Sequence, residues 1–223
     1  FSGSNISSKG NRDILVSKLD SSGNVLWAKN FGGTGNDISY GSTVLENGDS
    51  LITGQFSGTV SFRDTNLTSS GGSDGFVSKL DSFGNVLWAK KFGGTGNDSG
   101  YDVKAYTDNS SIVSGWFRDS ISFGNTNLTS SGDSDGFVSK LDSNGNVIWA
   151  KQFGGSGTDT VYDITSTADG SIISGFFQGS VEFGDTTLTS VGGLDSFFTK
   201  LDSNGNIVWT THFGGTGNVV KFF

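Results

Sequence analysis

The chain has 223 residues, which is enough for one substantial domain, and it contains 36 glycines, no proline and no cysteine. Its formal net charge of −8 disfavours nucleic acids and anionic membranes as partners, because an acidic surface repels both. No apolar run approaches the roughly 20 residues of a membrane-spanning helix, and the lack of cysteine excludes disulfides and thiolate metal sites. Short runs of β-branched and aromatic residues among many glycines predict an all-β protein with almost no helix.

A long unit repeats almost four times along the chain. Tryptophans recur at a nearly constant interval, and each is followed on the same predicted strand by a phenylalanine: Trp27, Trp88, Trp149 and Trp209, with Phe31, Phe92, Phe153 and Phe213. The related segments DILVSKLD, DGFVSKLD, DGFVSKLD and DSFFTKLD begin at Asp13, Asp74, Asp135 and Asp195. A repeat of this kind indicates units that bury their apolar faces against one another.

Each unit predicts four strands. In the unit 96–156 they cover residues 101–106, 111–117, 137–141 and 147–153. Turns at Asp108-Asn109 and at 142–145 separate the outer pairs, and a short extra hairpin turns at Gly124-Asn125.

The second strand of this unit is apolar on both faces, with Ile112 and Trp116 on one face and Val113 and Phe117 on the other. A sheet with two covered faces must lie between neighbours. Four antiparallel strands per stacked unit predict the blades of a β-propeller, in preference to a linear β-solenoid with shorter rungs.

In chain order, residues 1–34 supply the third and fourth strands of a partial blade. Residues 35–95, 96–156 and 157–216 form complete blades, and residues 217–223 begin a further blade. Because the second strand of the end blade is missing, we expect a partial or open propeller within a larger protein. The start at Phe1, with neither Met nor a signal-like segment, also suggests a mature or trimmed piece.

The string DGFVSKLDSFGNVLWAKKFGGTGNDSGYDVKAYTDNSSIVSGWF resembles the bacterial beta-propeller repeat called SBBP. The resemblance extends over essentially the whole chain, although this chain has Trp where many members have Tyr. It implies a β-propeller and a secreted or surface-exposed bacterial protein with a binding role. The insert GTVSFRDTNLTSSG is further similar to repeat arrays in large bacterial surface proteins.

The repeated loops GGTGND, GGTGND and GGSGTD match the start of a calcium-binding nonapeptide. In that motif calcium lies between turns that follow one another directly, whereas each copy here is separated from the next by a whole repeat. The apolar position of the motif is occupied by Ser39, Gly100 and Val161. We therefore expect structural loops in which glycine permits positive φ and the aspartate caps its own turn, with weak calcium binding left open.

The loops at 142–146 and 202–206, with the sequence DSNGN, resemble truncated oxygen-ligand loops. Phe83 occupies a would-be ligand position in the equivalent loop at 81–85, so we expect hairpin turns and no metal. A phosphate cradle needs a helix after the glycine-rich loop, and none is predicted. We expect no cofactor.

Catalytic chemistry has few candidates. His212 is the only histidine, and because Asn30, Lys91 and Gln152 take its place in the other units we expect it to face solvent. The repeated aspartates Asp13, Asp74, Asp135 and Asp195 could line one end of the ring, but recurrence in every unit is typical of a turn or strand cap. The sequence therefore predicts no catalytic residues and no enzyme.

The repeated tryptophans are expected to pack between blades. Trp116 differs, since Gln55 and Phe176 replace it elsewhere, and it is the best aromatic candidate for a ligand contact, although a core role is favoured. The recurring lysines should cover apolar surface with their stems and pair with neighbouring aspartates: Lys18, Lys79, Lys140 and Lys200.

These observations favour a non-enzymatic extracellular or cell-surface module, adhesin-like or structural, that binds a protein or glycan partner and further blades of the same or another chain. Two alternatives remain: a carbohydrate-binding, lectin-like propeller, and the non-catalytic part of a secreted hydrolase or lyase. A lectin should show the same polar and aromatic cluster in every blade. An enzyme should show one cluster of unlike charged residues that does not repeat.

Overall fold

The computed structural model describes residues 6–218, and every regular element in this range is a β-strand. The strands are β1 (Ile14–Leu19), β2 (Val25–Gly33), β3 (Asp37–Val44), β4 (Ser50–Phe56), β5 (Thr59–Phe62), β6 (Thr65–Thr68), β7 (Asp74–Leu80), β8 (Val86–Phe92), β9 (Asp98–Ala105), β10 (Ser111–Phe117), β11 (Ser120–Phe123), β12 (Thr126–Thr129), β13 (Asp135–Leu141), β14 (Val147–Phe153), β15 (Thr160–Thr167), β16 (Gly170–Phe183), β17 (Thr186–Asp202) and β18 (Ile207–Phe213). No helix that could cross a membrane occurs among these residues. The all-β prediction is confirmed.

Three repeated four-stranded antiparallel sheets follow one another along the chain. We call them the second sheet (β3-β4-β7-β8), the third sheet (β9-β10-β13-β14) and the fourth sheet (β15-β16-β17-β18). The first sheet consists of β1 and β2 extended by the hairpin β5-β6, which belongs to the next repeat. We call the contact between two consecutive sheets a junction.

The inserted hairpin of each repeat reaches back to the last strand of the sheet before it. In the first junction Gly32 pairs with Ser61 and Gly33 with Val60. In the next two junctions the equivalent contacts are single bridges, Gly93 to Ser122 and Gly155 to Val181. Backbone pairing therefore links every sheet to the following one.

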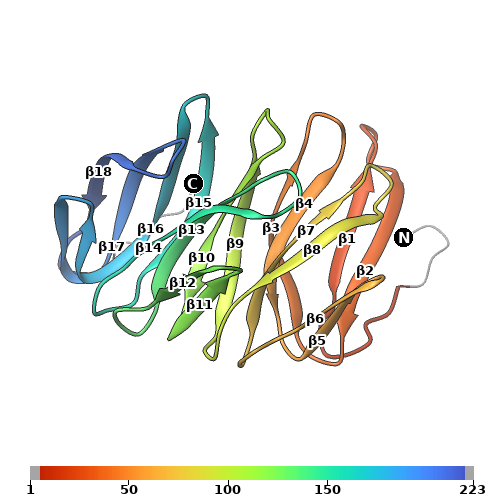
Figure 1. Ribbon diagram of the computed structural model, residues 1–223, viewed down its shortest axis with the longest axis horizontal. Helices are drawn as coiled ribbons and strands as arrows, with labels where there is room; N and C mark the ends of the chain where they lie inside the picture. The colour runs from red at the N-terminus through yellow and green to blue at the C-terminus, as the bar shows by residue number, and fades with distance from the viewer. Residues whose placement is uncertain (1–5, 219–223) are drawn as a thin grey trace.

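The four sheets stand side by side in chain order as an open row, with β1 and β2 at one end and β18 at the other (Figure 1). Residues 6–218 do not close a ring. The predicted start of a further blade at 217–223 falls largely outside the described residues, which end at 218.

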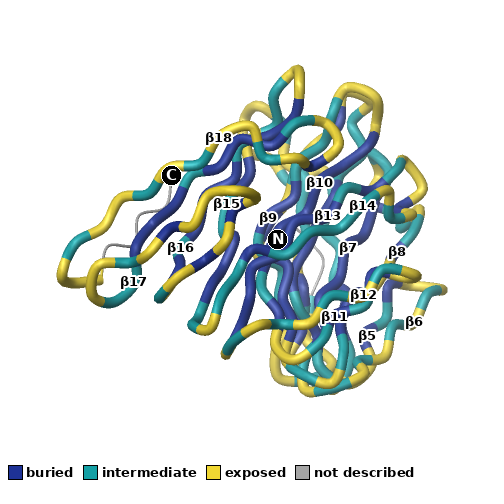
Figure 2. The backbone as a smooth tube through the Cα atoms, turned by 60° about the vertical axis from the view of Figure 1, so that its left-hand side comes forward, coloured by how far each residue is buried: buried dark blue, intermediate teal, exposed yellow. Residues whose placement is uncertain are grey.

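The apolar cores lie in the junctions. On β10, Val113 and Phe117 belong to a core shared with the second sheet, whereas Ile112 belongs to a core shared with the fourth sheet. The prediction that this strand lies between two neighbours is therefore confirmed. Figure 2 shows the buried stretches of β7, β9, β10 and β13 in the interior and the exposed turns at the tips.

The strands of the unit 96–156 lie close to the predicted positions. β10 and β14 have the predicted bounds, and the hairpin β11-β12 turns at Gly124-Asn125 as expected. β9 begins at Asp98, earlier than the predicted start at Tyr101, because it already pairs with the end of β10 there.

Three of the four repeated tryptophans pack between sheets, as predicted, whereas Trp209 on the last described strand is exposed. Each indole N–H donates to a serine carbonyl in the D-S-x-G-N loop of the following sheet, at nitrogen–oxygen distances of 3.0, 3.1 and 3.3 Å: Trp27 to Ser82, Trp88 to Ser143 and Trp149 to Ser203. The indole lies against the loop glycine, whose φ is 77° or 78°: Gly84, Gly145 and Gly205. We call each such loop a glycine seat.

Gly145→Ala should cost more stability than Gly23→Ala, although the two loops have the same turn. Both glycines have a left-handed φ, 77° and 82°, but a Cβ at Gly145 would lie 2.9 Å from the Trp88 ring, whereas a Cβ at Gly23 meets nothing within 4 Å among the described residues. Because both positions carry the same backbone strain, the two variants should differ only in the overpacking of the indole. We expect Gly145→Ala to lose about 1–3 kcal/mol more unfolding free energy than Gly23→Ala. Urea unfolding in dilute solution measures the difference, and equal losses would show that the indole does not depend on the seat.

Candidate binding sites between the sheets

The Gly-Gly-x-Gly-x-Asp loops connect the sheets. Their aspartates lie at the start of the next sheet and are fully buried: Asp37, Asp98 and Asp159. Each carboxylate accepts the N–H of the second loop glycine, at 2.7, 2.8 and 2.7 Å: Gly33, Gly94 and Gly155. The aspartate therefore caps its own turn, as expected.

The loop glycines are required for a different reason from the one expected. None of them has a positive φ in the three described loops, so that expectation was wrong. A Cβ would instead collide with neighbouring strands: at Gly93 it would lie 2.5 Å from the Asp74 carboxyl carbon, and at Gly94 it would lie 1.9 Å from the Ser120 carbonyl oxygen. The glycines allow the backbone to approach other strands closely.

The second set of repeated aspartates is held by hydrogen bonds within its own repeat. A nearby backbone N–H earlier in the chain donates to each of them: Lys9 to Asp13, Ser70 to Asp74, Ser131 to Asp135 and Val191 to Asp195. Side chains on the last strand donate as well: Asn30 to Asp13 at 2.8 Å, Lys91 to Asp74 at 3.2 Å and Gln152 to Asp135 at 2.9 Å.

The expectation that the position of His212 faces solvent was only partly right, because Lys91 is exposed but Asn30, Gln152 and His212 are half-buried. Its counterparts in the other repeats bind the repeated carboxylates. The His212 ring itself is half-buried and lies edge-on to Phe177, with the ring centres 5.9 Å apart.

In a junction the first carboxylate raises the pKa of the second, which is buried. Burial, and then the Asp74 charge, raise the pKa of Asp98 to about 7, and burial and Asp135 raise that of Asp159 to about 6. The Oδ1 atoms of Asp37 and Asp98 are buried without a hydrogen-bond partner among the described residues, which favours the neutral acid. Within residues 6–218 no three His, Asp, Glu or Cys side chains cluster in a way that could hold a metal ion.

The D-S-x-G-N loops are hairpin turns held by their own aspartates. Asp142 accepts the backbone N–H groups of Asn144 and Asn146 and the side-chain amide of Asn146, at 2.9, 2.8 and 2.9 Å. The bonds from Asn85 lower the pKa of the equivalent Asp81. Because these carboxylate oxygens face N–H donors, they are not arranged to receive a cation.

Two of the four recurring lysines form the predicted ion pairs. Lys79 lies 3.4 Å from Asp49, and Lys200 lies 2.6 Å from Asp169. Lys18 and Lys140 instead donate to the carbonyl groups of Ser82 and Ser203 in the next sheet, at 3.4 Å. The lysine heads thus also connect neighbouring sheets.

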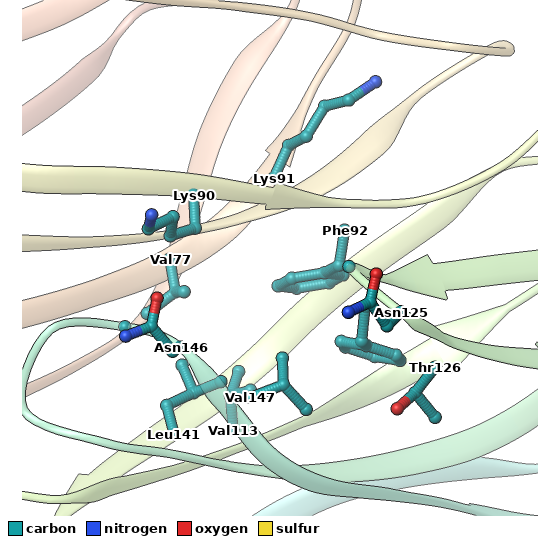
Figure 3. Close-up of a pocket in the computed structure, with 13 residues that line it drawn as sticks. Val77, Lys90, Lys91, Phe92, Val113, Asn125, Thr126, Leu141, Asn146 and Val147 are labelled. Atoms are coloured by element: carbon teal, nitrogen blue, oxygen red, sulfur yellow. The ribbon is translucent and has the colours of Figure 1, made fainter.

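A groove opens on the second junction, between β8, the hairpin β11-β12 and the loop before β14 (Figure 3). Its volume is about 360 Å³. Apolar side chains form the floor: Val77, Phe92, Val113, Phe123, Leu141 and Val147. Lys90 and Asn146 lie on one side of the opening and Asn125 and Thr126 on the other. An apolar floor with a few polar rim groups is typical of binding sites.

An equivalent groove of about 570 Å³ lies on the third junction. Lys151 corresponds to Lys90 there, but the hairpin contributes two acidic residues, Glu182 and Asp185, where the second junction has Ser122 and Asn125. The two rims therefore differ in charge. These grooves were not predicted from the sequence. The signal available there was the variation of these hairpin positions among the repeats.

A row of tyrosines was also missed. Tyr40, Tyr101 and Tyr162 are the extra residues of β-bulges in β3, β9 and β15. Tyr101 stacks on Tyr162 with ring centres 4.6 Å apart, and Tyr40 meets Tyr101 edge-on at 5.3 Å. Bulges redirect side chains and are frequent beside functional sites. The signal in the sequence is a tyrosine at the same place in three successive repeats.

One group of charged residues beside these tyrosines does not repeat in every sheet. Lys104 lies 2.9 Å from Asp102 and 4.0 Å from Asp163, while Gly41 occupies the aspartate position in the second sheet. Asp102 also accepts the Ile164 N–H at 3.0 Å. Burial and Asp102 raise the pKa of Asp163 to about 6. This is the kind of cluster that the enzyme alternative requires.

Trp116, the candidate for an aromatic ligand contact, is half-buried, and the Arg118 guanidinium lies 5.7 Å from its ring centre. Its counterpart Phe176 packs against Tyr162 at 5.5 Å. These neighbours give this position a packing role beside the tyrosine row.

Asp98→Asn should remove part of the pH dependence of stability. The pKa of Asp98 rises from 3.8 to about 7 in the folded protein, so between these values the folded state binds more protons than the unfolded state. Stability from this group is therefore present near the unfolded pKa and below it, and is lost as the pH rises toward the folded pKa. Asparagine keeps an oxygen for the Gly94 N–H, so the variant should gain stability relative to wild type under mildly alkaline conditions and not under acidic ones. Urea unfolding across this range tests it, and parallel pH profiles would contradict the raised pKa.

Comparison with known proteins gives distant likenesses. No protein-family model matches the chain. It is 28% identical over 200 residues to Regulatory protein FlaEY of Caulobacter vibrioides. This alignment covers 86% of the present chain and 20% of the relative. It is 29% identical over 157 residues to an uncharacterised WD repeat-containing protein of Acanthamoeba polyphaga mimivirus, covering 56% of this chain and 11% of that protein. A crystal structure of a protein of unknown function from Bacteroides caccae aligns over 96% of this chain and 95% of its own at 8% identity, with a TM-score of 0.31. The chain thus spans a fifth or less of the curated relatives that it matches.

Proposed function

We propose that the sheets are blades of a β-propeller, present as an open part of a longer repeat protein, and that the chain is a non-enzymatic binding or scaffolding module. The four-stranded antiparallel sheets, the hairpins that reach back across each junction and the likeness to a WD repeat-containing protein support the propeller. Location outside the cell or on its surface follows from the SBBP resemblance and is part of the proposal.

The repeated residues that suggested chemistry support a structural role in each blade. The aspartates bind loop N–H groups in sealed positions, and the tryptophans occupy the glycine seats. The carboxylates of Asp98 and Asp135 have no exposed surface on which a substrate could lie.

The observation that carries the proposal is the groove on the second junction. It combines an apolar floor with an exposed polar rim. Asn146 on that rim also bonds Asp142 inside the glycine seat, whereas Lys90 and Asn125 are exposed and take no part in the contact between Trp88 and the seat. Such residues are free to determine what the surface binds.

We propose a protein partner, bound as an extended segment, rather than a glycan. The groove on the third junction is the structural equivalent of the groove on the second junction, but it has Glu182 and Asp185 on its rim. A glycan built from identical sugar units would be bound by the same rim residues in every blade. Rims of unlike charge fit a polypeptide whose charged side chains vary along its length.

Selection of random displayed peptides on the immobilised protein tests this function. We expect enriched peptides with acidic residues whose affinity falls at least tenfold in Lys90→Glu, because the groove then repels them. Lys29→Glu, the same strand position on the first junction, serves as the matched control and should leave the affinity unchanged. Peptides that bind both variants equally would place the partner elsewhere and contradict the groove assignment.

The two alternatives have their own readouts. If no peptide is enriched but the protein binds a glycan on an array, and Asn125→Ala abolishes that binding, then the chain is a lectin and the proposal is wrong. If the protein turns over a hydrolase or lyase substrate and Asp163→Asn abolishes this activity, then the chain is an enzyme that acts at the cluster of Asp102, Lys104 and Asp163.

A further inference from the structure

The first junction has the same apolar floor as the groove on the second junction. Six apolar residues stand one repeat before the floor residues of that groove: Val16, Phe31, Ile52, Phe62, Leu80 and Val86. All six belong to one apolar cluster or pack against it. On the rim, Lys29 and Asn85 take the places of Lys90 and Asn146. The floor and one side of the rim are therefore alike in the two junctions.

The hairpins of these two junctions differ at the turn. Residues 61–71 and 122–132 have the same sequence except at two positions, where Arg63 and Asp64 replace Gly124 and Asn125. Arg63 is exposed and has a left-handed φ of 59°, close to the 66° of Gly124. A residue with a Cβ seldom adopts this conformation. The turn is thus built in the same way in both hairpins, but in the first it carries a long cationic side chain.

A side chain at this turn position starts beside the floor. At the equivalent Gly184, a Cβ would lie 3.7 Å from the side chain of Ile207, which lines the groove of the third junction. Val86 is the counterpart of Ile207 in the first junction. A Cβ at Gly124 meets nothing within 4 Å among the described residues, so the second groove has room for a longer side chain at its turn.

The charge of Arg63 acts on the opposite side of the opening. Asp81, in the glycine seat of the second sheet, accepts two bonds from Asn85 at 2.8 and 2.9 Å. These bonds, the Phe83 N–H and the Arg63 charge lower the pKa of Asp81. Asn85 corresponds to Asn146, which lies across the opening from the hairpin residues in the second groove (Figure 3). The charge of Arg63 therefore acts across the floor of the first junction.

We propose that Arg63 covers the floor of the first junction, so that this junction cannot take the acidic segment that the open second groove binds. The floor is present, but the arginine side chain fills the space that a partner needs. The third groove is not covered in this way, but Glu182 and Asp185 on its rim repel an acidic segment. The covering does not depend on the proposed function, whereas its consequence for the choice of partner rests on it.

Thiol labelling measures the covering without any partner. The chain has no cysteine, so Val86→Cys and Val147→Cys each place a single thiol on one of the two floors. Both valines are half-buried, which leaves a thiol at either position within reach of uncharged iodoacetamide. We expect Val86→Cys to react several-fold more slowly than Val147→Cys, and Arg63→Gly to raise its rate to that of Val147→Cys. Glycine suits the left-handed φ, so Arg63→Gly should fold as well as wild type.

Two further variants separate the covering from the charge of the turn. Gly124→Arg should slow the labelling of Val147→Cys. Asp64→Asn changes the charge of the first turn but keeps Arg63, so it should leave the rate of Val86→Cys unchanged. Equal rates for the two thiols with Arg63 in place, or no acceleration by Arg63→Gly, would overturn the proposal. Circular dichroism of each variant checks that it is folded.

Calorimetric titration with the acidic peptide that binds wild type most tightly tests the choice of partner. We expect one site per chain in wild type and two in the double variant Arg63→Gly/Asp64→Asn, whose first hairpin then has the sequence of the second. Lys29→Glu in the double variant should remove the added site and keep the original one. A double variant with a single site would contradict the choice of partner and leave the proposed function intact. If no acidic peptide binds wild type, the proposed function fails, and the labelling rates still decide whether Arg63 covers the floor.

Discussion

The packing of an indole on the left-handed glycine of the next sheet is the contact on which the rest of the structure depends. A sheet that is apolar on both faces cannot stand alone in water, so each sheet needs a neighbour in a fixed register. The D-S-x-G-N loop is shaped by its own aspartate and offers both a flat glycine surface and a serine carbonyl. The tryptophan of the preceding sheet fits both features, and this sets the distance and orientation at which the phenylalanine-rich cores close.

This constraint separates the residues that build the junctions from those that can serve function. Buried aspartates, loop glycines and tryptophans are committed to contacts that recur in each junction. The hairpin rim is not committed, and there the repeats differ, with Asn125 in one groove and Asp185 in the next. Exchange of the exposed rim residue between repeats leaves the tryptophan contact of each junction in place.

The sequence reveals what is local to one repeat. The strand positions and the packing of the tryptophans could be predicted because both follow from period and turn chemistry. The role of the His212 position could not be predicted. Its counterpart Gln152 binds Asp135 on the adjacent strand, and the spacing of residues along one strand does not reveal such a contact between strands. The grooves and the row of tyrosines are formed by residues of neighbouring sheets, which lie a full repeat apart in the chain. The sequence of a single repeat does not display them.

Hydrogen exchange of Trp149→Ala tests most directly whether the glycine seats hold the sheets together. We expect amide protection to fall in β13, β14 and the fourth sheet, which share the third junction, while the second sheet keeps its protection. Uniform loss across all four sheets would contradict it, because the chain would then unfold as one unit without separate junctions. Unchanged protection in the fourth sheet would show that the indole contact is dispensable.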